Sequence, residues 1–496
     1  MVRLALIAAL IAVPPAALIA AAGDDPASVI SPQLKKMVDL FVAVQENSAD
    51  PVSADTAFYQ GAIPAMLRTL DPHSSFFDPD QFLQLQQMER SEQKGFGSVV
   101  NVVPGRVLVL QVAAGTPSAK AGLSAGDEIL AVNNIALARL EPDQLIELLS
   151  EARKQQVTLD IHHPGESRLD RIVMSPDLVD TPTVDRVFHP AAGIGYLRIT
   201  SFEEQTGKLV KKAIEQLGGE DLKGLVIDLR DNPGGAVQAA IDTATLFLKS
   251  GQTIFSARGR AAQNEDVRVA KYNTPYKFPM AVLVNARTAS AAEILSGALQ
   301  DHDRAVILGQ ASYGKGLVQQ VFNLSQNTGL ALTTAFYYTP SGRSIQKPLK
   351  GGQLDAATVV DQGPYKTDAG REVRGGGGIQ PDEVVVDRRD TRLRQFLDAS
   401  GVLTIYAADF LKSHEVTESF EPDSAALDDL RVYLSERSIQ PSTSEWLADR
   451  TWIQSRLKQE IFNLKFGVTK GDEVEMLRDP VVTMAIERVQ TAPEVK

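Results

Sequence analysis

Three short, almost wholly apolar runs in the middle of the chain constrain its fold most strongly. They span residues 224–229, 280–284 and 305–308, and each has the length of a buried strand. Segments with helical spacing separate them, and this alternation over residues 193–386 predicts an α/β domain. Because 496 residues are too many for one hydrophobic core, we expect two to four domains and a leader.

The composition argues against several classes of function. The formal charge is −12, from 50 basic and 62 acidic residues, and there is no basic stripe with interleaved aromatic residues, so we expect no nucleic-acid binding. The chain has no cysteine, which removes disulfides, a thiolate nucleophile and cysteine-ligated metals. No spacing of histidines and carboxylates is typical of a metal site, and we expect no cofactor.

The N-terminus has the features of an export signal. Arg3 precedes an apolar stretch over residues 4–22, which ends in small residues before a polar junction. This order is typical of a secretory signal peptide over residues 1–22, so we expect an exported protein of the periplasm or cell envelope. The alternative is an uncleaved membrane anchor, because the run is nearly long enough to span a bilayer. The pair Pro14-Pro15 in its middle favours cleavage.

The rest of the chain divides into regions of different pattern. Residues 23–87 have helical spacing, interrupted by a turn sequence at residues 70–75. Short strands and glycine turns follow over residues 88–175, and the α/β pattern occupies residues 176–388. Residues 389–496 read as helices without a chemical motif, and we expect them to pack against one another or against a partner.

The region of short strands contains a candidate peptide-binding segment. Gly95-Phe96-Gly97-Ser98 lies just ahead of a predicted strand. Backbone N–H groups in such a segment can form a hollow that holds a carboxylate, and an extended peptide can pair along the strand edge. Together with residues 114–123 and 126–130, the segment resembles a PDZ domain of the bacterial protease type. The resemblance implies a domain that binds the C-termini of proteins and does not catalyse.

Two tight turns in the α/β region carry candidate catalytic groups. Ser290 stands between alanines where a strand gives way to a helix, and a helix N-terminus favours negative charge. The strand of residues 224–229 is followed by Pro233-Gly234-Gly235, a turn whose backbone N–H groups could form an oxyanion hole. Either turn, taken alone, is more simply explained as structure without chemistry.

A serine nucleophile needs a base, and the sequence favours a lysine. None of the six histidines lies among small residues, whereas Lys315 lies between Gly314 and Gly316. The usual pKa of lysine is about 10.4, and a useful base has a pKa of about 7 to 8. Burial can supply this shift of roughly three units, which corresponds to about 4 kcal/mol of bias against the charged form.

Five motifs in order along the chain resemble those of the carboxyl-terminal processing (tail-specific) serine peptidases. The resemblance extends from about residue 35 to residue 388. It implies an α/β (α+β) multidomain protein with a crotonase/ClpP-like α/β protease core, an inserted PDZ domain and flanking helical regions. The motifs are Leu70-Asp71-Pro72-His73-Ser74-Ser75, residues 228–235, Thr288–Ile294 with Gly314-Lys315-Gly316, Tyr337–Arg343 and Gly378–Asp382.

The resemblance also implies roles for individual residues. Ser290 would be the nucleophile, Lys315 the general base and Gln319 the residue that orients the lysine. The oxyanion hole would use the backbone N–H groups of Ala291 and of either Gly234 or Gly235.

Two further positions bear on this assignment. Ala292 departs from the family, many members of which have serine there, and this removes an ambiguity about the nucleophile. Asp301 matches an acidic position that is important in some members, with a solvated aspartate at a helix end as the alternative.

These features predict an endopeptidase that recognises the C-terminal tail of protein substrates through its PDZ domain and hydrolyses peptide bonds. We expect substrates with exposed apolar C-termini. The family often uses PDZ movement as a gate, so the prediction leaves room for an activating adaptor. It also leaves room for a homo-oligomer formed through the C-terminal helices.

Two alternatives belong to other classes of function. One is a catalytically inactive PDZ scaffold on a peptidase fold, which the presence of both Ser290 and Lys315 disfavours. The other is a nucleotide site, because Gly309, Gly314 and Lys315 have the spacing of a P-loop. A P-loop needs serine or threonine next, and Gly316 stands there, followed by residues that read as a strand.

Overall fold

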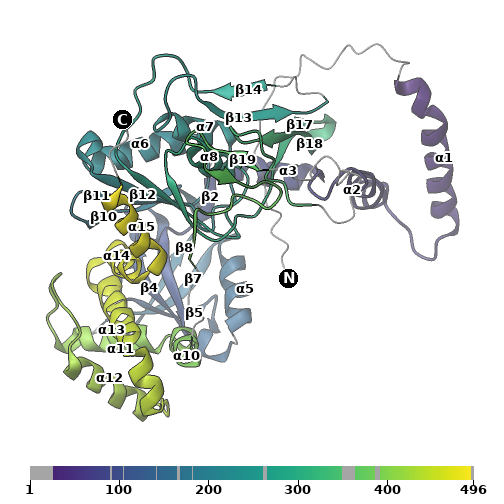
Figure 1. The fold of residues 1–496 in the computed structure, drawn as a ribbon. Helices are drawn as coiled ribbons and strands as arrows, with labels where there is room; N and C mark the ends of the chain where they lie inside the picture. The colour runs from purple at the N-terminus through teal and green to yellow at the C-terminus, as the bar shows by residue number, and fades with distance from the viewer. Residues whose placement is uncertain are drawn as a thin grey trace.

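The computed structural model describes most of the chain after the predicted leader (Figure 1). The leader, residues 1–22, lies outside the described residues. Among the residues described, no helix is both long and apolar enough to cross a membrane. The described ranges are 26–89, 92–103, 105–140, 142–164, 168–180, 182–260, 265–348, 364–385 and 391–492.

A six-stranded sheet forms the centre of the α/β region (Figure 1). Its strands lie in the order β10-β11-β12-β15-β16-β21, and all neighbours are parallel except β10 and β11. The predicted buried strands are confirmed as β12, β15 and β16, and every residue of β12 and β15 is buried. The strands are β10 Val184–Ala191, β11 Ile194–Ile199, β12 Gly224–Asp228, β15 Met280–Val284, β16 Val306–Gly309 and β21 Glu383–Val384.

Helices cover both faces of this sheet. Helices α6 (Thr206–Gln216), α7 (Val237–Thr245) and α8 (Ala291–Asp301) share one apolar core with it. Helix α15 (Pro480–Thr491), from the far end of the chain, belongs to a second core with the same sheet. This second core includes Tyr196, Val226, Ala281, Leu283 and Leu308 of the sheet and Val482, Ala485 and Val489 of α15. The end of the C-terminal region therefore completes the α/β core, which the sequence did not indicate.

A second sheet joins the N-terminal region to the α/β region. Its long strand β18 (Gly329–Tyr338) pairs with β1, β13 and β17, and β14 pairs with β13. Strand β17 (Leu317–Asn323) confirms the strand predicted after Lys315 and is incompatible with the helix that a P-loop requires. Strand β1 (Ser75–Phe77) was not predicted, because the sequence around it reads as turn and helix. The remaining strands are β13 Thr253–Arg258 and β14 Glu265–Arg268.

The region of short strands forms a small sheet of its own. The strand order is β3-β4-β5-β7-β8, with β6 paired to β5, so one edge of β3 has no strand partner within the described chain. Helix α5 packs on this sheet through Leu145. Strands β2 and β9, at the two ends of this region of the chain, pair with each other. The elements are β2 Glu92–Gly95, β3 Ser98–Val103, β4 Arg106–Val112, α4 Pro117–Lys120, β5 Glu128–Val132, β6 Ile135–Ala136, η2 Leu137–Arg139, α5 Pro142–Ala152, β7 Val157–His162, β8 Leu169–Met174 and β9 Asp177–Asp180.

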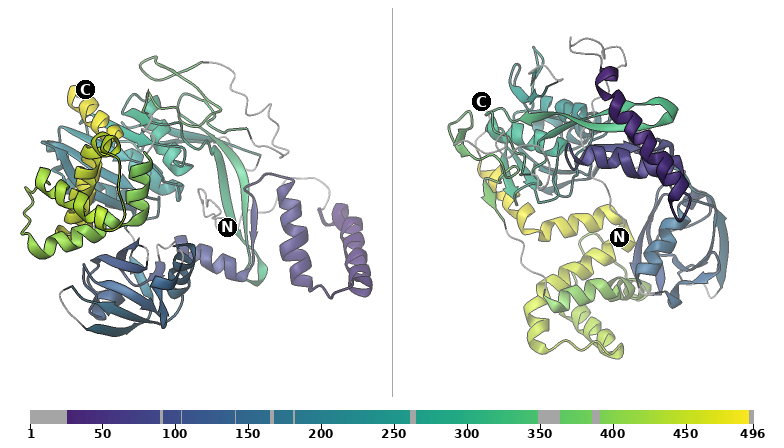
Figure 2. Two further views of the ribbon diagram at one scale, coloured as in Figure 1. Left: turned by 90° about the horizontal axis from the view of Figure 1, so that it is seen from below. Right: turned by 90° about the vertical axis from the view of Figure 1, so that its right-hand side faces the viewer.

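Helices flank these sheets at both ends of the chain, as the sequence predicted. Helix α1 lies at the margin of the molecule, apart from the α/β region (Figure 2). Helices α10 to α13 share a core, so the expectation that they pack against one another is confirmed. The helices are α1 Pro26–Asn47, η1 Thr56–Ala62, α2 Ile63–Arg68, α3 Pro79–Glu89, α10 Arg392–Ser400, α11 Val402–Ser413, α12 Ser424–Glu436, α13 Thr443–Phe466 and α14 Val468–Arg478. Short elements between the sheets are η3 Gly219–Asp221, η4 Ser325–Asn327, β19 Tyr365–Lys366 and β20 Glu372–Val373.

Candidate active site

Ser290 occupies a strained turn between β15 and α8. Its φ is 56° and its ψ is −117°, a conformation that a residue with a Cβ rarely adopts. The side chain is fully buried, and its Oγ makes no hydrogen bond within the part of the chain that the structure describes. The Tyr337 hydroxyl donates to the Ser290 carbonyl at 3.2 Å. The turn is thus held by its surroundings while the hydroxyl itself remains uncommitted.

Glu293 connects the serine turn to the lysine loop. Its Oε2 accepts the backbone N–H of Ser290 at 2.8 Å and that of Lys315 at 2.9 Å. Its Oε1 accepts the Gly314 N–H at 2.7 Å and the Ser312 hydroxyl at 2.5 Å. Burial raises the pKa of Glu293, and these hydrogen bonds lower it part of the way. One carboxylate therefore holds both candidate catalytic residues within two hydrogen bonds of each other.

The side chain of Lys315 ends in a buried chain of hydrogen bonds. Its Nζ donates to Gln319 Oε1 at 3.1 Å, and Gln319 Nε2 donates to the His73 carbonyl at 2.8 Å. Burial lowers the pKa of Lys315 to about 8, against the opposing effects of Asp71 and Glu293. A substantial fraction of the lysine is therefore neutral near pH 8, as a general base requires.

The two glycines proposed for the oxyanion hole differ in what their N–H groups do. The Gly234 N–H donates to Asn232 Oδ1 at 2.8 Å, so it is already used. Within the described residues, neither the Gly235 N–H nor the Ala291 N–H donates a backbone hydrogen bond. Gly234 still matters sterically, because a Cβ there would lie 2.7 Å from the Cβ of Ser290. Among the described residues, Gly235 and Ala291 therefore keep N–H groups that no backbone carbonyl accepts, and Ala291 directly follows the serine.

The predicted peptide-binding segment joins the end of β2, at Gly95, to the start of β3, at Ser98. Gly97 has a φ of 76°, and a Cβ there would lie 2.3 Å from the Thr116 side chain, so only glycine fits. The Phe96 and Gly97 carbonyls accept backbone N–H groups of residues 118 and 113, which fixes the loop. Beside it, one edge of β3 has no strand partner among the described residues, and the Asn101 side chain of β3 donates to the Thr404 hydroxyl of α11.

Two acidic residues of α8, Asp301 and Glu293, have surroundings that the sequence did not predict. Asp301 is not a solvated helix end, because it is buried and forms an ion pair with the buried Arg343 at 2.7 Å. Its Oδ2 also accepts the Ser341 N–H at 3.0 Å, which points to a structural role. Glu293 was missed as a site residue; a lone acidic residue in the first turn of an otherwise apolar helix was the available signal.

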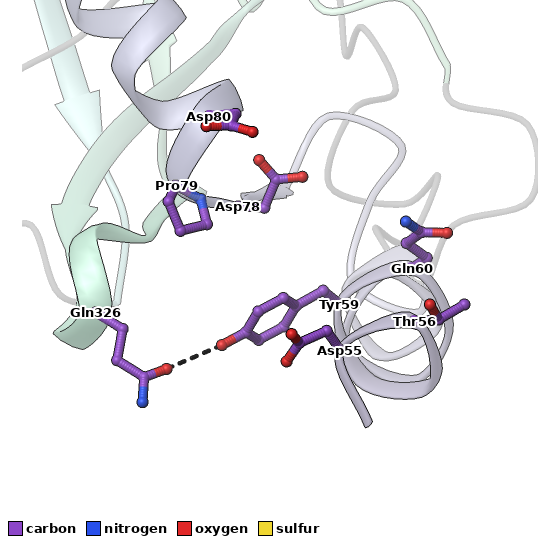
Figure 3. Close-up of a pocket in the computed structure, with 8 residues that line it drawn as sticks. All are labelled: Asp55, Thr56, Tyr59, Gln60, Asp78, Pro79, Asp80 and Gln326. Atoms are coloured by element: carbon purple, nitrogen blue, oxygen red, sulfur yellow. Dashed lines mark hydrogen bonds between the residues drawn. The ribbon is translucent and has the colours of Figure 1, made fainter. Parts of the chain in front are cut away.

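A separate hollow lies between the N-terminal elements and η4, the turn that carries Gln326 (Figure 3). Its volume is about 610 Å³, and neither Ser290 nor Lys315 lines it. Among the described residues, no group of three or more histidines and carboxylates is arranged to hold a metal ion. The lining residues are Asp55, Thr56, Tyr59, Gln60, Asp78, Pro79, Asp80 and Gln326.

Sequence comparisons connect the chain to known proteins. Residues 193–356 match the pattern of peptidase family S41, and residues 108–162 match that of a PDZ domain. A carboxy-terminal-processing protease of Bartonella bacilliformis is 37% identical over 320 residues, which are 63% of this chain and 73% of that protein. A carboxyl-terminal-processing protease of Synechocystis sp. is 34% identical over 292 residues, with shares of 58% and 68%. A solved structure of a photosystem II D1 C-terminal processing protease is 26% identical, covers 72% of this chain and 88% of that one, and gives a TM-score of 0.39.

Proposed function

This chain belongs to the carboxy-terminal processing proteases of peptidase family S41, and from that premise we propose that Ser290 and Lys315 form its catalytic dyad. It is a serine-type endopeptidase with a PDZ domain, and its substrates are proteins. The observation that carries the dyad is the Glu293 carboxylate, which accepts hydrogen bonds from the backbones of both residues. The buried setting of the lysine, which favours its neutral form, supports the same assignment.

In the proposed reaction, neutral Lys315 takes the proton of the Ser290 hydroxyl as Oγ attacks a peptide carbonyl. Among the described residues the Ser290 hydroxyl makes no hydrogen bond, so no such bond has to break before it donates its proton to Lys315 Nζ. The developing oxyanion is bound by the N–H groups of Gly235 and Ala291, with Gly234 as the close-packed neighbour. The lysine ammonium protonates the leaving amine, and an acyl-enzyme remains. Water then gives one proton to Lys315 and attacks the ester carbonyl. The lysine returns that proton to the leaving Ser290 Oγ, and the new C-terminus is released.

Gln319 orients the base in this proposal. Its Oε1 accepts from Nζ, which keeps the amine at a fixed position in both protonation states. A buried amine without a compensating partner destabilises the fold. A scaffold that does not catalyse would gain nothing from Lys315 in return for this loss of stability, so the buried lysine disfavours the scaffold function.

We propose that substrates enter by their C-terminal tails. The tail's carboxylate would bind at Gly95-Phe96-Gly97-Ser98 and its backbone would pair with the open edge of β3. We also keep three proposals from the sequence: export by the leader of residues 1–22, an activating adaptor, and a homo-oligomer. For the homo-oligomer, the exposed apolar side chains of α1, among them Leu34, Val38 and Leu40, support a contact through this helix and not through the C-terminal helices named above.

The domain division proposed from the sequence is 23–87, 88–175, 176–388 and 389–496. The contact of α15 with the central sheet supports one change to it. The last helix would belong structurally with the peptidase domain, because its apolar face is buried in that domain's core.

The test is degradation of an unstructured protein with an apolar C-terminus by the chain from Gly23 onward, beside Ser290→Ala and Lys315→Ala. We expect the parent to cleave and both variants, shown to be folded by circular dichroism, to be inactive. Cleavage that survives either substitution would overturn the dyad. A parent that binds the tail and cleaves nothing, even with the PDZ domain saturated by tail peptide, would favour the scaffold function.

A further inference from the structure

A turn from the N-terminal region reaches the proposed base. Residues 71–74 connect α2 to β1, and β1 pairs with β18, with Ser75 opposite Ala331. The Ser74 hydroxyl accepts the Thr333 N–H at 3.1 Å, one strand away from β17, where Gln319 lies. The turn is therefore fastened to the sheet that carries Gln319, although more than two hundred residues separate them in sequence.

The carbonyl of His73 determines which way the Gln319 amide faces. An amide has one accepting and one donating end, and Gln319 Nε2 donates to the His73 carbonyl at 2.8 Å. The accepting Oε1 must then face Lys315 Nζ, at 3.1 Å. Without that carbonyl the amide could turn over and present its N–H to the lysine. A neutral amine would accept this N–H through the lone pair that it needs for the serine proton.

Asp71 holds the His73 carbonyl in place. Its side chain is buried, and its Oδ1 accepts the backbone N–H groups of His73 and Ser74, both at 2.8 Å. Its Oδ2 accepts the Ser74 hydroxyl at 2.7 Å. These three hydrogen bonds close the turn around one carboxylate, and Pro72 within it removes further backbone freedom.

Three titratable side chains interact with the lysine, two from the turn of residues 71–74 and one from α8. Asp71 and Glu293 are the charges that oppose the lowering of the Lys315 pKa by burial. His73 is the third: burial, followed by the Lys315 charge, lowers its pKa to about 4, although Asp71 raises it. His73 is therefore neutral at the pH where the lysine titrates, and Asp71 is the charge that the N-terminal region contributes.

We propose that the turn Asp71-Pro72-His73-Ser74 is a positioning element of the general base, in which Asp71 fixes the His73 carbonyl, the carbonyl fixes Gln319, and Gln319 fixes Lys315. The proposal rests on the Ser290–Lys315 dyad. In this proposal, both the peptidase core and the N-terminal region contribute residues to the active site. The turn belongs to the N-terminal region because it follows helix α2, which ends at Arg68.

The test is the pH dependence of kcat/KM for Asp71→Asn in the full chain. Asparagine keeps an acceptor for the two N–H groups and can donate to Ser74, so the turn can still close. Loss of the negative charge favours the neutral lysine, and we expect the acid limb of the profile to move to lower pH by roughly half a unit or more. Asp80→Asn is the matched control, because Asp80 is an exposed carboxylate of the same region, and its limb should not move.

The outcomes separate this proposal from the dyad itself. Ser290→Ala and Lys315→Ala, assayed in parallel, must be inactive; activity in either refutes the dyad. If they are inactive and the limb of Asp71→Asn coincides with that of the parent, the Asp71 carboxylate does not lie close enough to the base to act on it, and the positioning role of its turn is wrong.

Should Asp71→Asn fail to fold, Ser74→Ala replaces it, because it removes one hydrogen bond from Asp71 and one from Thr333. We expect its kcat to fall severalfold with KM unchanged. A change confined to KM, or no change, would overturn the proposal.

Discussion

Replacing Glu293 with glutamine should damage both stability and activity. The carboxylate is fully buried and accepts four hydrogen bonds, two at each oxygen. Glutamine keeps one accepting oxygen, and its amide nitrogen would face two donors. If Oε2 is the oxygen replaced, those donors are the N–H groups of Ser290 and Lys315.

The number of hydrogen bonds lost determines how far Glu293→Gln should lower the free energy of unfolding. Each hydrogen bond to a buried charged acceptor contributes about 1.5 to 3 kcal/mol, so losing two costs about 3 to 6 kcal/mol. That is a large part of the 5 to 15 kcal/mol by which a domain is typically stable. A displacement of about 1 Å between catalytic groups lowers the rate about 100-fold, and we expect kcat/KM to fall by about that factor.

The assay is thermal unfolding together with kcat/KM on an unstructured substrate. Ser296→Ala is the matched control, because Ser296 is buried in the same helix and its hydroxyl donates to helix carbonyls alone. The Ser296→Ala substitution should lower the free energy of unfolding by about 1 kcal/mol at most and leave kcat/KM near the parent value. A Glu293→Gln protein with parental Tm and kcat/KM would refute the claim that this carboxylate holds the two loops together.

Three further predictions follow from the buried groups and the glycine loop. Lys315→Met should abolish activity and raise stability at pH 7 by roughly 3 kcal/mol, because the folded pKa of about 8 lies below the value of 10.5 for a free lysine. The unfolded chain then holds the extra proton between these pH values, so the penalty is complete below pH 8 and the gain seen by thermal unfolding should fade towards pH 10.5. Asp301→Asn should lower stability by about 3 to 5 kcal/mol in denaturant titrations, because it leaves the buried Arg343 without its counter-ion; an unchanged midpoint would contradict this. Gly97→Ala should weaken binding of a tail peptide, measured by fluorescence polarisation, because the new Cβ would collide with Thr116, and undiminished affinity would contradict the proposed loop.

The sequence predicted those parts of the fold that depend on local pattern. The apolar runs became β12, β15 and β16, and the residues after Lys315 form a strand. Small residues around Ser290 indicated a tight strand-to-helix turn, and the structure has one, with a positive φ at the serine.

What the sequence did not predict depends on contacts between distant segments. The turn chemistry of residues 70–75 was recognised, but not that its carbonyl meets Gln319, because no local signal specifies a partner 246 residues away. The apolar face of α15 is visible in the sequence, yet the sheet that it covers is not. The sequence also could not show that the Gly234 N–H donates to a side chain, because this depends on the position of Asn232.

The most direct test of the central claim is covalent labelling of the nucleophile with a fluorophosphonate, followed by peptide mass spectrometry. We predict that the label is found on Ser290 in the parent chain. It should be absent from Ser290→Ala and strongly reduced in Lys315→Ala, because the hydroxyl then lacks its base. Label on another residue, or label that persists in Ser290→Ala, would contradict the account.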